Sequence, residues 1–238
     1  MSSTARTITQ VAVVVPARDE AEGLPAALAA MTVAMGRVAV ACPRQRLLIV
    51  ADSCSDGTAD LAKRHGPTGT QVVEVDVGNV GAARRRGFTQ ALRSWVDDPE
   101  RCWLATTDAD SAVPPDWLEA QLHLALAGWD AVAGPIAITD WTSWPPTVRH
   151  RLQAHRRAQH APSAHGANLG CSAAAYLDAG GMPPLATSED RALWLAIGGT
   201  GRPVCHSTAA PVITSARRHG RAPGGLAQLL TELEDLPA

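Results

Sequence analysis

The chain has 238 residues, of which 46% are hydrophobic and 18% charged, and its formal net charge at pH 7 is -2. A chain of this length can bury one sizeable core, so we expect a single domain over 1–238. The small net charge gives no reason to expect nucleic-acid binding. Because 1–10 is polar and the first apolar run, 11–15, is too short to cross a bilayer, we predict a cytoplasmic protein without a membrane span.

Apolar runs alternate with helical patterns through the first half of the chain. Four such strand–helix units in succession predict a parallel, doubly wound α/β sheet. The sequence contains neither Gly-x-Gly-x-x-Gly after the first strand nor a P-loop pattern, so it supports neither a dinucleotide fold nor a P-loop fold. The predicted strands are 11–15, 47–50, 71–77 and the run that starts at 102, and the predicted helices are 22–35, 59–65, 82–95 and 115–127.

The second half is less regular. Further strands are predicted over 131–139 and within 203–214, helices over 172–179 and about 188–198, a turn over 165–170, and a peripheral helix or frayed tail at the C-terminus. The segment 141–165 contains four arginines, four histidines and no acidic residue. It is either a solvated helix face or an element that supplies positive charge to an anionic acceptor.

The cysteines are scattered and show no Cys-x-x-Cys spacing: Cys42, Cys54, Cys102, Cys171 and Cys205. We interpret them as reduced and mostly buried, and we predict neither a disulfide framework nor a zinc site.

Two carboxylates one residue apart, Asp108 and Asp110, follow the fourth predicted strand. Ligands of open α/β sheets bind beyond the carboxyl ends of the strands. Carboxylate oxygens there suit Mg²⁺ or Mn²⁺ carrying a diphosphate. Taken alone, the pair is equally compatible with a cap of the turn before Pro114.

Six motifs in one order resemble glycosyltransferase family 2, the nucleotide-sugar glycosyltransferases with a GT-A fold. They are Val14–Glu20, Asp52–Thr58, Asn79–Gly87, Asp108–Asp110, His165–Gly181 and Ser188–Asp190. The resemblance covers about 11–221. It implies a GT-A fold with a Rossmann-like, mostly parallel sheet, a nucleotide-binding half over about 10–110, an acceptor-binding half over about 111–221, and a tail over 222–238.

The first motifs are implied to bind the nucleoside. Pro16, Ala17, Arg18 and Glu20 are expected to line its pocket. Asp52 is expected to accept a hydrogen bond from the base, which favours a UDP-sugar because uracil N3–H is a donor.

The next motifs are implied to hold the diphosphate and a divalent metal. Arg84 is expected near the diphosphate, with Asp108 and Ala109 beside the nucleotide. Asp110 is expected to bind Mn²⁺ or Mg²⁺. For a late histidine ligand the flanking string 217–221 favours His219, with His206 second.

The remaining motifs are implied to form the acceptor side. His165, Gly166 and Asn168 are expected to shape the pocket of the donor sugar and acceptor. Glu189 and Asp190 match the acid pair near the acceptor hydroxyl. Asp190 is the expected general base if the reaction inverts the anomeric centre; if it retains configuration, the pair orients the substrates.

The expected activity is transfer of a sugar from a nucleotide sugar to a hydroxyl of a small molecule or lipid headgroup. One alternative is a sugar-phosphate nucleotidyltransferase, which the lack of a Gly-rich, Arg-containing loop after the first strand disfavours. The other is an inactive nucleotide-sugar-binding protein. The presence of four acids of the family pattern, Asp52, Asp110, Glu189 and Asp190, weighs against an inactive protein. Acids placed near one another destabilise a fold unless a cation or substrate offsets their charge. The sequence leaves monomer and homodimer open.

Overall fold

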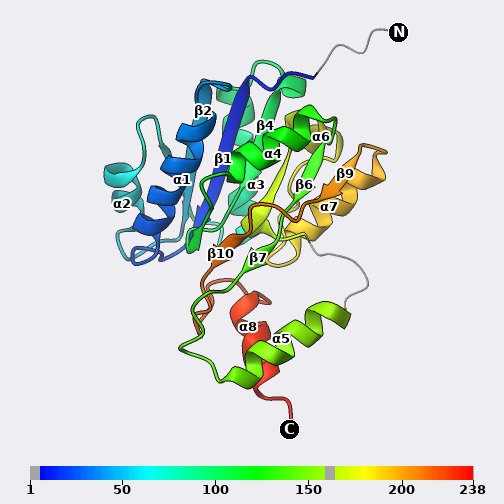
Figure 1. The fold of residues 1–238 in the computed structure, drawn as a ribbon. Helices are drawn as coiled ribbons and strands as arrows, with labels where there is room; N and C mark the ends of the chain where they lie inside the picture. The colour runs from blue at the N-terminus through cyan, green and yellow to red at the C-terminus, as the bar shows by residue number, and fades with distance from the viewer. Residues whose placement is uncertain (1–5, 159–163, 238) are drawn as a thin grey trace.

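The computed structural model describes residues 6–158 and 164–237 and places a mixed sheet between layers of helices (Figure 1). The strands of the main sheet are β1 (Gln10–Ala17), β2 (Arg44–Asp52), β3 (Gln71–Val75), β4 (Cys102–Thr106), β6 (Ala131–Ala133), β8 (Leu169–Ser172) and β9 (Val204–His206). Their order is β3-β2-β1-β4-β8-β6-β9. The predicted order of elements through the first four units is confirmed.

The pairs β1–β2, β2–β3, β1–β4 and β6–β9 are parallel, whereas β8 is antiparallel to both β4 and β6. The sheet is therefore mostly parallel, as predicted. The prediction of a turn over 165–170 was wrong in part, because a 3₁₀ turn, η2 (Gly166–Asn168), leads into β8 there. This strand has four residues, three of which are small, so its sequence pattern alone does not indicate a strand, and its pairing with β4 and β6 defines it.

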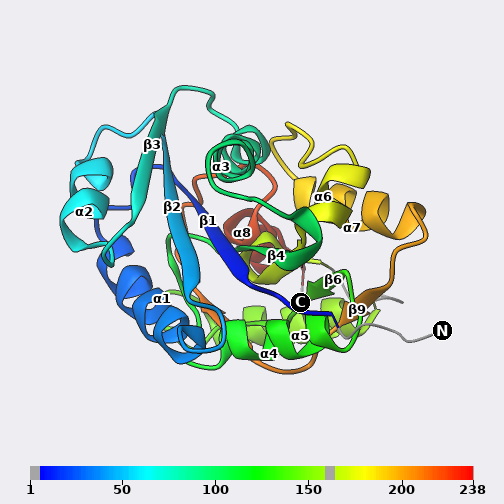
Figure 2. The same cartoon turned by 90° about the horizontal axis from the view of Figure 1, so that it is seen from above.

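Helices cover both faces of the sheet, and they are α1 (Leu24–Val38), α2 (Thr58–His65), α3 (Val80–Ser94), α4 (Trp117–Leu126), α6 (Ala173–Asp178) and α7 (Glu189–Gly199). Seen from above, α1 and α4 lie on one side and α3, α6 and α7 on the other (Figure 2). Successive β1 residues feed two cores: Val13 and Val15 join the α1–α4 side, and Val14 joins the α3 side. A strand covered on both faces requires the continuous apolar run seen in the sequence.

The strand predicted over 131–139 is interrupted. It forms β6 and then β7 (Ile136–Ala137), which leaves the main sheet and joins β5 (Ser111–Ala112) and β10 (Val212–Thr214) in a second sheet of order β5-β10-β7. Gly134 and Pro135 stand at the break. A Cβ on Gly134 would lie 2.3 Å from Nδ2 of Asn168, so the backbone passes too close to that side chain for any other residue.

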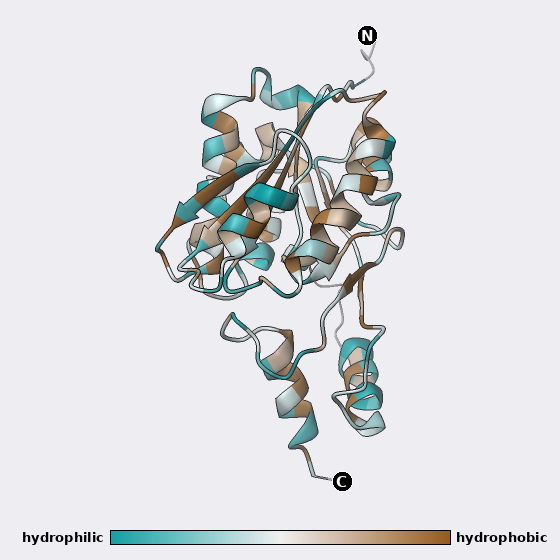
Figure 3. Cartoon of the chain, turned by 90° about the vertical axis from the view of Figure 1, so that its left-hand side faces the viewer, coloured by the Kyte–Doolittle hydropathy of each residue, from teal (hydrophilic) through white to brown (hydrophobic). Residues whose placement is uncertain are grey.

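Two further helices, α5 (Pro146–Ala158) and α8 (Leu226–Glu234), pack against each other beyond the carboxyl ends of the main strands (Figure 1). Their own small core contains Trp144, Val148, Leu152, Leu230 and Leu233. The hydropathy colouring shows largely apolar strands in the main sheet; α5 is mostly polar, whereas α8 contains both apolar and polar residues (Figure 3). The C-terminal segment thus contains a packed helix, the first of the two predicted alternatives.

None of the helices in 6–158 and 164–237 is both long and apolar enough to cross a bilayer.

Candidate functional site

The carboxyl ends of β1, β2 and β4 lie side by side. In the sheet register Val14 pairs with Thr106, and Pro16 pairs with Val50. Asp52, the last residue of β2, and Asp108, which follows β4, therefore lie along one edge of the sheet. This is the edge where open α/β sheets bind their ligands.

Asp52, at the end of β2, is hydrogen-bonded to the loop after β3. Its carboxylate accepts backbone N–H bonds from Val77, Gly78 and Asn79 at 2.8, 2.9 and 3.0 Å. Burial acts to raise the pKa of Asp52, but these bonds and one from Ser53 outweigh it, so the pKa lies below its usual value. The carboxylate is 4% exposed, and Oδ1 takes most of the bonds. Asp52 thus shapes the loop that leads into α3.

Arg84 is the centre of a buried ionic cluster. It lies on α3, whose first turn is capped by the side chain of Asn79 accepting from Ala82 N–H at 2.9 Å. The guanidinium forms ion pairs with Asp108 and with Glu189, and its Nε donates to Thr106 Oγ1 at 3.2 Å. The predicted metal motif and the predicted acid pair are therefore bridged by one arginine.

Glu189 is only 4% exposed, and burial raises its pKa even though the Arg84 charge opposes that rise. It is the first residue of α7, which begins close to the predicted helix start at about 188. Ser188 itself makes no side-chain cap hydrogen bond and has a left-handed backbone with φ of 59°. The start of α7 is instead fixed by the ion pair of Glu189 with Arg84 and by the hydrogen bond that Asp190 accepts from Gly166.

Gly166 brings the predicted acceptor segment against both acids. Its N–H donates to Asp190 Oδ2 at 2.6 Å. A Cβ at Gly166 would lie 2.4 Å from Nη2 of Arg84, so only glycine allows the guanidinium to occupy its place. His165, Gly166, Asp190 and Arg84 consequently form one contiguous site.

Asn168 lies inside the fold. Its Nδ2 donates to the carbonyls of Pro135 and Ala210, both at 3.0 Å, and its Oδ1 accepts from Trp117 Nε1 at 2.9 Å. A weaker bond from Gln121 fills the remaining acceptor position. Asn168 therefore connects the backbone at Pro135 and Ala210 to α4. Both polar atoms of its side chain are hydrogen-bonded within the protein.

Asp110 and Glu20 share one cation, Arg217. The guanidinium forms two 2.7 Å bonds with Glu20 and lies 3.1 Å from Asp110 Oδ2. Burial, reinforced by Asp108, raises the pKa of Asp110 to about 6 although Arg217 opposes the shift. Glu20 also has its backbone N–H bonded to Thr58 Oγ1 at 2.8 Å.

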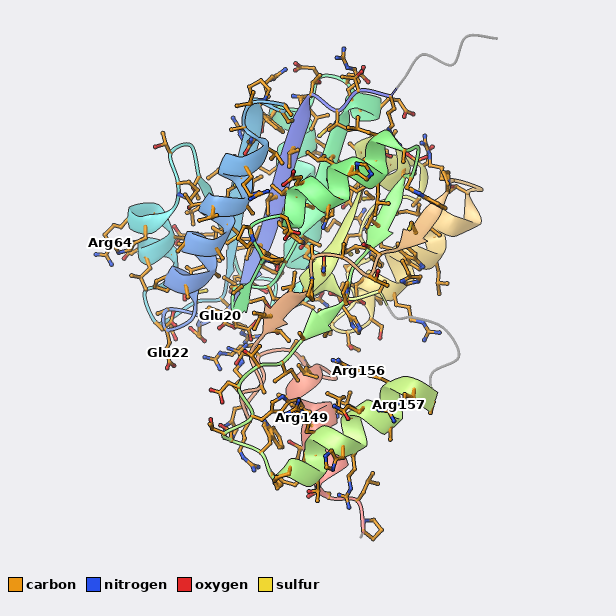
Figure 4. All side chains as sticks on the ribbon, in the orientation of Figure 1. Glu20, Glu22, Arg64, Arg149, Arg156 and Arg157 are labelled. Atoms are coloured by element: carbon orange, nitrogen blue, oxygen red, sulfur yellow. The ribbon has the colours of Figure 1, made fainter. Side chains whose placement is uncertain are left out.

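The other residues of the first motif differ in exposure: Pro16 is half-buried, Ala17 is buried and Arg18 is exposed. Ala109, next to Asp110, is buried. Figure 4 labels Glu20 at the lower end of the sheet, the end that faces α5 and α8. The predicted nucleoside residues therefore lie on the same side of the molecule as Asp110.

The donor set fits a divalent ion only when substrate oxygens contribute. Within the described residues, no group of three or more His, Cys, Asp or Glu side chains is placed to hold a metal. Mg²⁺ is commonly held by one or two carboxylates together with substrate phosphates. Asp110 and Asp108 supply two such carboxylates, and each already has a guanidinium neighbour.

The sequence prediction missed Arg217. It singled out the basic string 217–221 but selected its histidine, whereas Arg217 is the residue of this string that contacts Asp110; His219 is exposed. A signal was present, because two acids predicted at one strand edge, Glu20 and Asp110, require a counter-charge.

His165, predicted to shape the acceptor pocket, is half-buried directly before η2. Burial lowers the pKa of His165, although the negative charge of Asp190 opposes the shift. The His206 ring stacks on Trp194 of α7 with ring centroids 4.6 Å apart. His206, the histidine predicted as the second choice for the metal, thus packs against α7.

The family model described as glycosyl transferase family 2 matches residues 12–178. A polyprenol monophosphomannose synthase of Mycolicibacterium smegmatis is 30% identical over 149 residues, 60% of this chain and 52% of that protein. An undecaprenyl-phosphate 4-deoxy-4-formamido-L-arabinose transferase of Aeromonas hydrophila is 25% identical over 167 residues, 70% of this chain and 48% of that protein. The chain spans about half the length of these relatives.

Two solved structures are similar in fold. Staphylococcus aureus TarS 1-349 in complex with UDP-GlcNAc has a TM-score of 0.67 at 12% identity, covering 94% of this chain and 65% of that chain. The mannosyltransferase PcManGT of Pyrobaculum calidifontis, in complex with GDP-Man and Mn²⁺, has a TM-score of 0.64 at 19% identity, covering 89% and 58%.

Proposed function

The chain belongs to glycosyl transferase family 2, and on that premise we propose that it transfers a sugar from a nucleoside-diphosphate sugar to an acceptor hydroxyl. It has the GT-A fold of the neighbouring structures. The observation that carries the proposal is the bridge through Arg84, which connects Asp108 after β4 to Glu189 at the start of α7. Asp108, an acid of the proposed donor side, and Glu189, an acid of the proposed acceptor side, thus both form ion pairs with Arg84.

The nucleoside is proposed to lie against the first motif, at Pro16, Ala17, Arg18 and Glu20. Asp52 Oδ2 accepts a single backbone N–H, from Asn79, and keeps acceptor capacity for a donor on the base. This supports uracil, whose N3–H is such a donor, and hence a UDP-sugar.

The diphosphate is proposed to lie near Arg84, Asp108, Ala109 and Asp110. Asp110 and Asp108 would hold Mn²⁺ or Mg²⁺ jointly with the phosphates, and His219 is the candidate further ligand from the loop after β10. When bound, the ion supplies charge stabilisation to the leaving diphosphate. Arg84 contributes a fixed positive charge from within the protein.

Asp190 is proposed as the general base of an inverting reaction. Its Oδ2 is held by Gly166 N–H, which fixes the carboxylate beside the acceptor segment. From there it would take the proton of the acceptor hydroxyl while that oxygen attacks the sugar C1 from the face opposite the diphosphate. Glu189, buried and paired with Arg84, would keep the start of α7 in place.

The relatives' names contain polyprenol and undecaprenyl phosphate, so lipid-linked acceptors belong in the acceptor screen beside small hydroxyl compounds. A homodimer remains a proposal that size-exclusion chromatography with light scattering would check.

Thermal unfolding with UDP or GDP, each with and without Mn²⁺, tests donor binding. A ligand at about 100 times its Kd stabilises the native state by about 2.7 kcal/mol, so a specific nucleotide gives a clear Tm increase. We expect UDP with Mn²⁺ to give the largest increase. Asp110→Asn should remove the Mn²⁺-dependent part, whereas Asp116→Asn, at an exposed position directly before α4 and without a side-chain cap bond, should keep it.

Activity is then measured as nucleotide release from a panel of donors. If the protein releases UDP from a donor and Asp190→Asn abolishes that release, the result supports the proposed glycosyltransferase activity. Nucleotide binding without release from any donor, with any acceptor, would instead identify an inactive binding protein.

A further inference from the structure

Arg217 is bound to two carboxylates by contacts of unequal strength. Its Nη1 and Nη2 each donate to one carboxylate oxygen of Glu20 at 2.7 Å, which makes this pair bidentate. The contact with Asp110 is an ion pair in which Nη2 lies 3.1 Å from Oδ2. Because Nη2 already donates to Glu20, the Asp110 contact is the weaker of the two. Glu20 therefore anchors the guanidinium, and Asp110 is the partner that it can exchange.

Neighbouring arginines fix the backbone on which Arg217 stands. Arg221 Nη2 donates to the backbone carbonyl of Asp19 at 2.7 Å. Arg218 donates to both carboxylate oxygens of Glu234 on α8, at 2.8 and 2.9 Å. The string 217–221 is thus bound to the first motif at one point and to the helix pair at another. A change of partner by Arg217 requires rotation of its side chain and no movement of this backbone.

The guanidinium of Arg217 lies where a cation on Asp110 would lie. An ion bound to a carboxylate oxygen of Asp110 stands about 2.1 Å from that oxygen, and Arg217 Nη2 already lies 3.1 Å from Oδ2. Repulsion between a divalent ion and a guanidinium at such short range opposes their binding together. Arg84, beside Asp108, has a side chain that is only 4% exposed, whereas that of Arg217 is 27% exposed. Arg217 is therefore the arginine that can give way.

We propose that Arg217 and the divalent cation exchange at Asp110. In the free protein the guanidinium neutralises Asp110 and keeps the cation out. When nucleotide and cation bind together, Arg217 leaves Asp110, stays paired with Glu20 and donates to an oxygen of the diphosphate. The place of the diphosphate rests on the proposed function, but the competition at Asp110 does not. The exchange makes binding of the cation depend on the nucleotide.

The first experiment measures Mn²⁺ binding to the nucleotide-free protein from the electron paramagnetic resonance signal of unbound Mn²⁺. We expect Arg217→Gln to bind Mn²⁺ about tenfold more tightly than the unmodified protein, because the competing charge is gone. Arg217→Lys retains that charge and should stay close to the unmodified protein. An unchanged Mn²⁺ affinity in Arg217→Gln overturns the proposal.

Arg221→Gln is the matched control, since it removes the same charge from the same string. Among the described residues, the hydrogen bonds of Arg221 go to the backbone carbonyls of Asp19 and His219. Its replacement should change the Mn²⁺ affinity less than about twofold, because exposed charges interact weakly. A gain in Arg221→Gln equal to that in Arg217→Gln would reflect the overall charge of the loop and contradict the exchange.

A double variant locates the additional affinity. Adding Asp110→Asn to Arg217→Gln should return Mn²⁺ binding to the level of the unmodified protein, because the carboxylate that Arg217 released is then absent. A gain that persists in the double variant would place the ion on Glu20 and contradict an exchange at Asp110.

The unmodified protein offers an independent measurement that does not depend on the stability of Arg217→Gln. In nitrogen-15 NMR spectra the Nε–H signal of Arg217 is the one missing from Arg217→Lys. We expect this signal to shift when UDP and diamagnetic Mg²⁺ are added together and to stay in place with Mg²⁺ alone. An unchanged signal at saturating UDP and Mg²⁺ overturns the proposal.

These results keep the exchange apart from the proposed function. If Arg217→Gln binds Mn²⁺ more tightly and no donor is turned over, the proposed function fails while the competition at Asp110 stands. If the unmodified protein releases UDP from a donor and Arg217→Gln binds Mn²⁺ no more tightly than it does, the exchange fails while the proposed function stands.

Discussion

The Arg84 guanidinium on α3 and the Glu189 carboxylate on α7 form an ion pair in which the side chains are only 4% and 5% exposed. The two residues are separated by 105 positions in the chain. Breaking a buried pair by removing one partner leaves an uncompensated charge. The contribution of this ion pair to the candidate site can therefore be tested by measuring the free energy of unfolding of variants that lack one partner.

Replacing Arg84 by Met should lower the free energy of unfolding by about 3–5 kcal/mol, because Glu189 stays buried without its partner. Urea denaturation measures this. Arg93→Met, at an exposed position near the end of the same helix, should change stability by less than about 0.5 kcal/mol. Adding Glu189→Gln to Arg84→Met should recover part of the loss; if the two losses simply add, the pair is not the cause.

Gly166→Ala should lower sugar transfer at least tenfold. The added Cβ would meet the Arg84 guanidinium at 2.4 Å, so either Arg84 or the segment that positions Asp190 must move. Gly198→Ala on α7 is the matched control, because nothing lies within 4 Å of its Cβ. Retained activity in Gly166→Ala with a normal Tm would show that this close approach is dispensable.

Asp52 should make stability depend on acid pH. Its pKa is lowered in the folded state, so its contribution is present above the unfolded-state pKa and is lost as pH falls through the folded-state pKa. We expect the free energy of unfolding to drop with acidification below about pH 4–5. In Asp52→Asn the drop should be smaller and stability near pH 7 lower by about 2 kcal/mol. Asp60→Asn, exposed in the first turn of α2, should leave the pH profile unchanged.

The metal should bind strongly only with nucleotide. Because the described residues offer two carboxylates and no preformed cluster, a chelator should leave the Tm of the nucleotide-free protein within about 1 °C. It should lower the Tm of the UDP complex clearly. A large effect of the chelator without nucleotide would indicate a preformed metal site and contradict this expectation.

The helix pair α5–α8 should depend on its own small core. Leu230 is fully buried there, so Leu230→Ala should cost about 2–4 kcal/mol in urea denaturation. Leu236→Ala removes the same atoms from a side chain that is 51% exposed and should be close to neutral. Equal effects would mean that the pair contributes little to the measured unfolding.

The sequence by itself determined the order of the parallel strand–helix units and placed acids at the carboxyl ends of β2 and β4. Both are local properties: continuous apolar runs such as 11–15 define buried strands, and polar residues such as Asp52 and Asp108 mark where they stop. The family pattern likewise depends on motif order along the chain. For these features no contact between distant residues has to be known.

Only the tertiary structure decided which charges meet. The pairing of Arg217 with Asp110, the interior position of Asn168 and the antiparallel insertion of β8 all join segments distant in sequence. Identical local patterns are compatible with other partners, because a basic string or a short run of small residues does not specify what it contacts. The physical reason is that burial and ion pairing depend on contacts between different helices and strands, whereas the periodicity of a segment reflects only its own secondary structure.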